Sequence, residues 1–141
     1  MNEKDIENLI PHRERMRLPD TIIRTDETSA VCEATVKESW PMAEKGNVSP
    51  LVLIELIAQT SAVCIGNKER KAGNDPARGK GWLVGIKSAD FFTEAIPLHT
   101  RIRSLAEIRF TLDNFTEIRG TAEIDGKTAG EIILQVMRSE C

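Results

Sequence analysis

The stretch SPLVLIELIAQTSAVCIG, residues 49–66, decides the fold expected for this chain. Ser49 followed by Pro50 is typical of a helix start, with serine as the N-cap and proline at the first helical position. Gly66 suits a helix end. Apolar side chains surround the axis of this helix nearly all round, which predicts a buried helix. Glu55 lies in the middle, so its carboxylate must either reach water or be held in a pocket that uses it.

Segments on both sides of this helix alternate between apolar and polar residues. A period of two predicts strands that bury one face. A short helix is expected over residues 3–10 and ends at Pro11. Residues 38–48 and 67–81 hold the glycine and polar residues that are typical of loops. The expected strands cover residues 20–24, 29–37, 82–92, 106–113, 115–124 and 128–137.

Asp125–Gly126 separates the last two expected strands and is a strong signal for a two-residue hairpin. The late strands therefore pair antiparallel. One long buried helix with five or six strands favours a single α+β domain over residues 1–141. The economical packing is an antiparallel sheet wrapped around the central helix. Because such a sheet leaves its edges open, we expect a homodimer or a higher homo-oligomer.

The composition excludes several classes of protein. The 141 residues are 40% hydrophobic and 29% charged, as in an ordinary soluble globular protein. A net charge of −3 gives no reason to expect nucleic-acid binding. No apolar run reaches the ~20 residues of a membrane span, and the acidic N-terminus does not resemble a signal peptide. The three cysteines, Cys32, Cys64 and Cys141, are expected to be reduced thiols of a cytoplasmic protein, with no metal site and no cofactor.

Three stretches resemble the hotdog-fold 3-hydroxyacyl-acyl carrier protein dehydratases, and more narrowly their relatives in aryl-polyene gene clusters. The family's opening Leu-Pro-His-Arg, followed by an apolar stretch and Asp, is similar to LIPHRERMRLPD at 9–20. Its central helix reads Leu-Glu-Ala-Met-Ala-Gln and is similar to LVLIELIAQTSA at 51–62. Its strand Gly-Ile-x-x-Ala-x-Phe through to Val-Pro-Gly-Asp is similar to LVGIKSADFFTEAIPLHT at 83–100. With the final hairpin, the likeness covers nearly the whole chain.

The resemblance implies a hotdog fold and a substrate that is an acyl thioester of acyl carrier protein or coenzyme A. In that family the helix glutamate works with a histidine from across the dimer interface as an acid/base pair. By position, the glutamate falls on Glu55 and the helix glutamine on Gln59. These two are four residues apart and share one helix face. Ala62 and Gly66 continue that face with little bulk, so an acyl chain or a pantetheine arm could lie against it.

The chain departs from the family at two positions. The family's histidine stands 14 residues before the glutamate, and counting back from Glu55 ends at Pro41. A glycine amide at the start of the family's helix holds the thioester carbonyl, but here Pro50 has no N–H to offer. The amides of Leu51 and Val52 remain at this helix start and could still polarise a carbonyl.

Other side chains near the matched segments carry two interpretations each. His12 is interpreted as structural and His99 as a turn residue, although either could replace the missing histidine. Glu44 is interpreted as an exposed loop acid, or as a substitute acid close to the lost position. Gln59 either orients Glu55 or a carbonyl, or makes a core hydrogen bond.

A basic loop follows the expected helix. This loop contains two acidic residues, Glu69 and Asp75, and a larger number of basic ones. This loop is either a docking patch for an acidic carrier protein or coenzyme A phosphates, or an ordinary solvated loop. The basic residues are Lys68, Arg70, Lys71, Arg78 and Lys80.

The leading hypothesis is a 3-hydroxyacyl-ACP dehydratase-like protein of fatty-acid or polyene-type synthesis, with Glu55 as the catalytic residue. Gln59, Leu51, Val52 and Ala62 are the expected substrate-binding residues. One alternative is an acyl-CoA or acyl-ACP thioesterase that uses the helix glutamate to activate water or to attack the carbonyl. Another is a non-catalytic acyl or carrier-protein binding subunit whose partner supplies the histidine.

Overall fold

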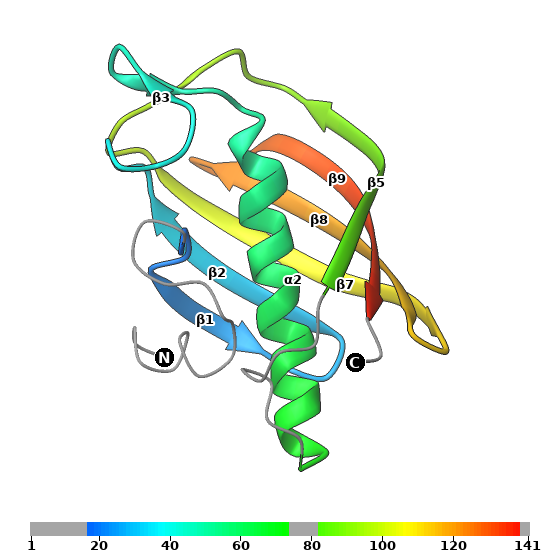
Figure 1. Cartoon of the computed structure of the whole chain (residues 1–141). Helices are drawn as coiled ribbons and strands as arrows, with labels where there is room; N and C mark the ends of the chain where they lie inside the picture. Colours follow the sequence, from blue (N-terminus) through cyan, green and yellow to red (C-terminus); the bar gives the residue numbers. More distant parts are fainter. Residues whose placement is uncertain (1–16, 74–81, 139–141) are drawn as a thin grey trace.

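The computed structural model describes residues 17–73 and 82–138. Its main elements are β1 (Thr21–Thr25), β2 (Ser29–Thr35), α2 (Val52–Lys71), β5 (Trp82–Phe91), β7 (Arg101–Leu112), β8 (Phe115–Ile124) and β9 (Lys127–Arg138). Six strands form one antiparallel sheet in the order β1-β2-β7-β8-β9-β5. Helix α2 lies across the concave face of this curved sheet (Figure 1). The predicted α+β class, an antiparallel sheet wrapped around a long helix, is confirmed.

A second, smaller sheet forms, and two of its three strands lie within residues 38–48, the region predicted to be a loop. It consists of β3 (Ala43–Glu44), β4 (Asn47–Val48) and β6 (Ile96–Pro97), in that order. The turn between β3 and β4 places Lys45 and Gly46 in the left-handed region, at φ 51° and 81°. Figure 1 shows β3 at the same end of the molecule as the start of α2. This small sheet therefore borders the end of the helix that carries Glu55.

Both ends of α2 differ from the prediction. The helix begins at Val52 rather than at Ser49, because the preceding residues form a tighter turn with bonds from the Val52 amide to the Ser49 carbonyl. It continues past Gly66, which is buried, and ends only where Gly73 takes a left-handed φ of 87°. Residues 67–71 are therefore helical, not part of a loop.

The strand predictions hold best where the alternation is clean. Asp125 and Gly126 take φ values of 51° and 76°, as a two-residue hairpin with two left-handed positions requires. Strand β8 has the predicted bounds. Strand β7 begins at Arg101, five residues before the predicted start at 106. The inward position Ser104 interrupts the apolar pattern there, yet it is fully buried and hydrogen-bonds to Thr60 of the helix at 2.7 Å.

The core lies between α2 and the concave face of the sheet. Gly120 on β8 is where helix and sheet approach most tightly, since a Cβ atom there would overlap the Ile57 side chain. The buried helix residues that face the sheet include Val52, Leu53, Leu56, Ile57, Val63 and Cys64. None of the described helices is long and apolar enough to cross a membrane.

We expect Gly120→Ala to destabilise the protein, because the added methyl group forces Ile57 and the helix away from the sheet. Overpacking of a tight core costs about 1–3 kcal/mol. Urea unfolding followed by circular dichroism measures this free energy. Gly85→Ala is the matched control, since a Cβ on Gly85 of β5 meets no atom closer than 3.8 Å. Equal stability of the two variants would contradict the packing described.

Candidate functional site

The site is built around Glu55, which lies in the first turn of α2. One helical turn later, the Gln59 side chain is completely buried. Its Nε2 donates to Oε1 of Glu55 at 2.9 Å, and its Oε1 accepts from the backbone amide of Leu18 at 2.7 Å. The chain just before β1 therefore fixes Gln59, and Gln59 fixes one carboxylate oxygen of Glu55. Gln59 thus makes a core hydrogen bond and also contacts Glu55, and its role in positioning substrate groups stays a prediction.

Glu55 lies on the side of α2 that the sheet does not cover. Its side chain is only partly buried, as is that of Ala62 two turns further on. Leu51 before the helix is 51% exposed. The residues on this side of the helix share intermediate or high exposure and are mostly small or apolar: Leu51, Ile54, Glu55, Ala58, Ala62 and Ile65. Although the helix is apolar nearly all round, the described residues bury this stripe only partly, and we call it the open stripe.

The backbone amides at the helix start are already engaged. Leu51 donates to the hydroxyl oxygen of Ser49 at 3.2 Å, and Val52 donates to the Ser49 carbonyl at 3.0 Å. The Val52 side chain is buried in the core. To hold a substrate carbonyl, these two amides would therefore have to give up their hydrogen bonds to Ser49. Their assignment as substrate contacts stays a prediction.

The position of the family's histidine is occupied by Pro41, which is exposed in the loop after β2. Its neighbour Trp40 turns inward, and its side chain is 4% exposed among core residues such as Val48 and Val52. Within the part of the chain that the structure describes, the Trp40 indole N–H is buried without an acceptor. No pattern in the sequence singles out Trp40 beyond its aromatic character.

The alternative proton carriers lie at different places. His99 is exposed in the turn between β6 and β7, with a left-handed φ of 71° and its amide bound to the Val36 carbonyl at 2.9 Å. His99 is therefore a turn residue, as predicted. Glu44 is exposed on β3. His12 lies outside the described residues.

The predicted docking residues divide between the helix and an undescribed segment. Lys68, Arg70 and Lys71 are exposed in the last turn of α2, where positive charge also complements the helix dipole. Arg78 and Lys80 lie outside the described residues. At 1.5 Å rise per residue, Lys68 is about 20 Å along the helix axis from Glu55. The described part of the patch is therefore at the opposite end of the helix from the carboxylate.

The two described cysteines, Cys32 and Cys64, do not form a nucleophilic site. Burial raises the pKa of the Cys32 thiol to about 12, and burial together with the Asp26 charge raises that of Cys64 to about 11. Both thiols are therefore protonated at neutral pH and serve as core residues. Residues 17–73 and 82–138 contain no group of three or more side chains that could hold a metal ion.

Comparison with known families decides the assignment. Residues 4–140 match the ApeP-like dehydratases, described as ApeP dehydratase. The chain belongs to the ApeP-like dehydratase family. A second relative is the 3-hydroxyacyl-[acyl-carrier-protein] dehydratase FabZ of Clostridium perfringens, which is 31% identical over 144 residues that cover 96% of this chain and 99% of FabZ.

Solved structures confirm the hotdog fold of this ApeP-like protein. The dehydratase heterocomplex ApeI:P from Xenorhabdus doucetiae superposes with a TM-score of 0.81 and 17% identity, covering 96% of this chain and 91% of that one. A hypothetical thioesterase with coenzyme A from Streptococcus pneumoniae superposes at 0.63 and 14%, covering 84% of each chain. At these identities the likeness concerns the fold alone. The family likeness of the sequence and the fold therefore agree on a dehydratase-like hotdog protein.

Proposed function

We propose that this ApeP-like protein acts on a 3-hydroxyacyl thioester carried by acyl carrier protein or coenzyme A. Dehydration removes the proton from C2 and the hydroxyl group from C3, which leaves an enoyl thioester and one water molecule. A base takes the C2 proton while an acid protonates the departing hydroxyl. Glu55 is the residue assigned to this proton transfer, and Gln59 is its positioning residue.

The observation that carries the proposal is the hydrogen-bond chain from Leu18 through Gln59 to Glu55. The buried Gln59 amide accepts a hydrogen bond from the Leu18 backbone through its oxygen and donates one to a Glu55 oxygen through its nitrogen. These two bonds hold the carboxylate in one orientation. The carboxylate is also on the open stripe, where the small side chains of Ala58 and Ala62 are only partly buried, and we expect an extended acyl chain to lie against them. Fixed orientation and an open side are what proton transfer to a bound substrate requires.

A single carboxylate serves both proton transfers only with the help of water or of a second residue. The matched histidine position is Pro41, so we propose that the second group comes from a subunit packed on the open stripe. That subunit is either a second copy of this chain or a related dehydratase subunit, as in the ApeI:P heterocomplex. Among the described strands, β5 lies at an edge of the main sheet, which supports pairing, because an edge strand is a ready site for a second sheet.

Three related expectations belong to this proposal. The chain is a single hotdog domain, it works in the cytoplasm, and its minimal assembly is a dimer. The buried, unpaired thiols of Cys32 and Cys64 support a reducing compartment. The chemistry needs no metal and no organic cofactor, since both proton transfers use side chains.

A substrate panel tests the proposal. The purified protein, alone and with a histidine-containing dehydratase subunit, is incubated with 3-hydroxyacyl-ACP, 3-hydroxyacyl-CoA and saturated acyl-CoA. Enoyl product supports dehydration. Free thiol from the saturated substrate supports the second candidate, a thioesterase, which the hotdog fold of the coenzyme A complex from S. pneumoniae makes a fair alternative. Binding without turnover under every condition supports a non-catalytic subunit and contradicts the proposal.

A further inference from the structure

Trp40 carries an N–H group that the described chain leaves without a partner. Its side chain is 4% exposed, and its indole nitrogen is buried with no acceptor in the part of the chain that the structure describes. An indole N–H can only donate, so its partner must be an acceptor such as an oxygen atom. Buried polar groups in native proteins are nearly always paired, because an unpaired one loses its bond to water and gains none. We therefore expect the acceptor for Trp40 to come from a bound molecule.

The chain around Trp40 is held in a tight turn that keeps the indole inward. The Trp40 amide donates to the Lys37 carbonyl at 3.0 Å, and the Trp40 carbonyl accepts from the Ala43 amide at 3.3 Å. Met42 takes a left-handed φ of 63°, which is unfavourable for a residue other than glycine. The backbone groups of Trp40 are thus paired within the turn, and its indole N–H is not.

This turn lies beside the part of the core that positions Glu55. Figure 1 shows the chain between β2 and β3 at the end of the molecule where α2 begins. The Trp40 side chain belongs to the buried cluster that also contains Leu18 and Val52, the first residue of α2. Val52 is three residues before Glu55, and the Leu18 amide binds Gln59. The same cluster therefore supports both the unpaired N–H and the carboxylate assigned to proton transfer.

The proposed dehydration needs a hydrogen-bond donor at the thioester carbonyl. When a base takes the C2 proton, negative charge develops on the carbonyl oxygen, and a donor placed there in advance stabilises it. At the helix start, Pro50 has no N–H, and the amides of Leu51 and Val52 already bind Ser49. The Trp40 N–H, in contrast, gives up no bond within the described chain when it binds an oxygen.

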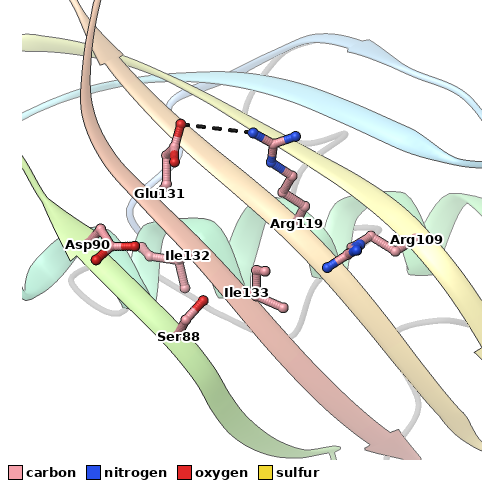
Figure 2. A pocket seen from close by; sticks show the side chains of 7 residues that line it. All are labelled: Ser88, Asp90, Arg109, Arg119, Glu131, Ile132 and Ile133. Atoms are coloured by element: carbon pink, nitrogen blue, oxygen red, sulfur yellow. Dashed lines mark ion pairs between the residues drawn. The ribbon is translucent and has the colours of Figure 1, made fainter.

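The arginine side chains of the outer face of the sheet lie on the wrong side for this role. Figure 2 shows Arg109 and Arg119 beside a shallow pocket of about 280 Å³. Ile132 of β9 packs in the core, so its neighbour Glu131, which lines the pocket, points to the face opposite α2. Both arginines already pair with carboxylates of that face. The sheet therefore separates these donors from Glu55.

We propose that Nε1 of Trp40 donates a hydrogen bond to the thioester carbonyl oxygen of the bound substrate. The indole keeps its proton throughout, so Trp40 stabilises charge while the proton transfers take place elsewhere. Because the nitrogen is covered in the described chain, the turn of residues 37–46 shifts to admit the carbonyl. The left-handed Met42 and the unpaired N–H both raise the free energy of the covered state, which makes this shift less costly. The inference rests on the proposed function, since it assigns a binding residue for the same substrate.

The indole N–H signals of the ¹⁵N-labelled, full-length protein in its native assembly test this contact. The sequence has two tryptophans, so Trp82→Phe identifies the Trp40 signal. The probe is a 3-hydroxyacyl-pantetheine amide, and the matched control is the corresponding 3-hydroxyalkyl thioether, which lacks the carbonyl. We expect the first probe to move the Trp40 N–H proton downfield, as a new hydrogen bond does, and the thioether to leave it in place.

The outcomes of this titration separate the two proposals. Binding of both probes, seen in other signals, with an equal Trp40 shift or none overturns the role of Trp40 and leaves the proposed function standing. Failure of both probes to bind contradicts the proposed function and this inference together.

Replacing the N–H itself separates substrate binding from packing. 3-Benzothienylalanine has nearly the shape of tryptophan but carries sulfur where tryptophan has the N–H. It is incorporated in place of Trp40 in Trp82→Phe protein, and the same protein with Trp40 intact is the control. We expect kcat/KM for dehydration to fall at least about tenfold, as for the loss of a donor to a developing oxyanion.

The stability of this protein gives the second readout. The urea midpoint should not fall, because removing an N–H that has no acceptor breaks no bond within the protein. A lower midpoint would show that the N–H has a structural partner, and an unchanged kcat/KM would show that it does not bind the substrate. Either result overturns the proposal.

Discussion

Glu55→Gln is expected to lower kcat for dehydration of a 3-hydroxyacyl thioester by at least about 100-fold, the loss typical of removing a general acid or base. Glutamine has the same shape and can still accept the hydrogen bond from Gln59, but it cannot exchange a proton with substrate. Because Glu55 is only partly buried, the fold should survive this change. Initial rates of enoyl-thioester formation, measured at saturating substrate, give the result.

Two other glutamates serve as controls for this experiment. Glu38→Gln changes an exposed carboxylate after β2 and should leave kcat unchanged. Glu44→Gln changes the exposed acid on β3, a strand at the same end of the molecule as the start of α2. A large loss for Glu44→Gln, with full activity for Glu55→Gln, would move the acid to the small sheet and contradict the assignment.

Gln59→Leu is expected to lower both activity and stability. The leucine removes the donor that orients Glu55 and also leaves the buried Leu18 amide without its acceptor. An unsatisfied buried amide costs about 1–3 kcal/mol, which urea unfolding measures. Loss of orientation should lower kcat about tenfold or more, since misplaced catalytic groups are inefficient. Full activity in a folded Gln59→Leu protein would show that Glu55 needs no positioning.

Gln59→Glu separates positioning from packing. The introduced side chain keeps an oxygen for the Leu18 amide, but it sets a second carboxylate beside Glu55. The new carboxylate repels that of Glu55 and offers it no N–H, so Glu55 is no longer held in one orientation. We therefore expect kcat to fall about tenfold or more, as in Gln59→Leu, although the Leu18 amide keeps an acceptor. Full activity in a folded Gln59→Glu protein would show that the Gln59 N–H does not position Glu55.

The fold was largely predictable because its local signals agree with its packing. The alternation over β8 and the Asp125–Gly126 turn determine the antiparallel hairpin without help from distant residues. The helix was predictable from its apolar surface, but its end was not. Gly66 is a good stop signal locally, yet tertiary packing keeps the helix going until Gly73.

The part of the site that could be predicted is the part that depends on the spacing of residues along the helix. Four residues between Glu55 and Gln59 place them on one helix face, and the structure joins them. The Leu18 amide lies 41 residues away in the sequence, so no local pattern reveals it. The β-bulges at Lys87 and Arg109, whose side chains both pair with Glu117, are equally invisible, because a bulge changes the backbone register without changing the residue pattern.

The most direct test of the central claim is a crystal structure of the assembled protein with a 3-hydroxyacyl-pantetheine amide, which cannot lose its carrier by hydrolysis. The account predicts that the acyl chain lies along Ala58 and Ala62. It also predicts that a Glu55 carboxylate oxygen lies about 2.6–3.2 Å from the C3 hydroxyl oxygen or from C2, which is within reach for proton transfer. A ligand bound elsewhere, with protein side chains covering Glu55 on the open stripe, would contradict it.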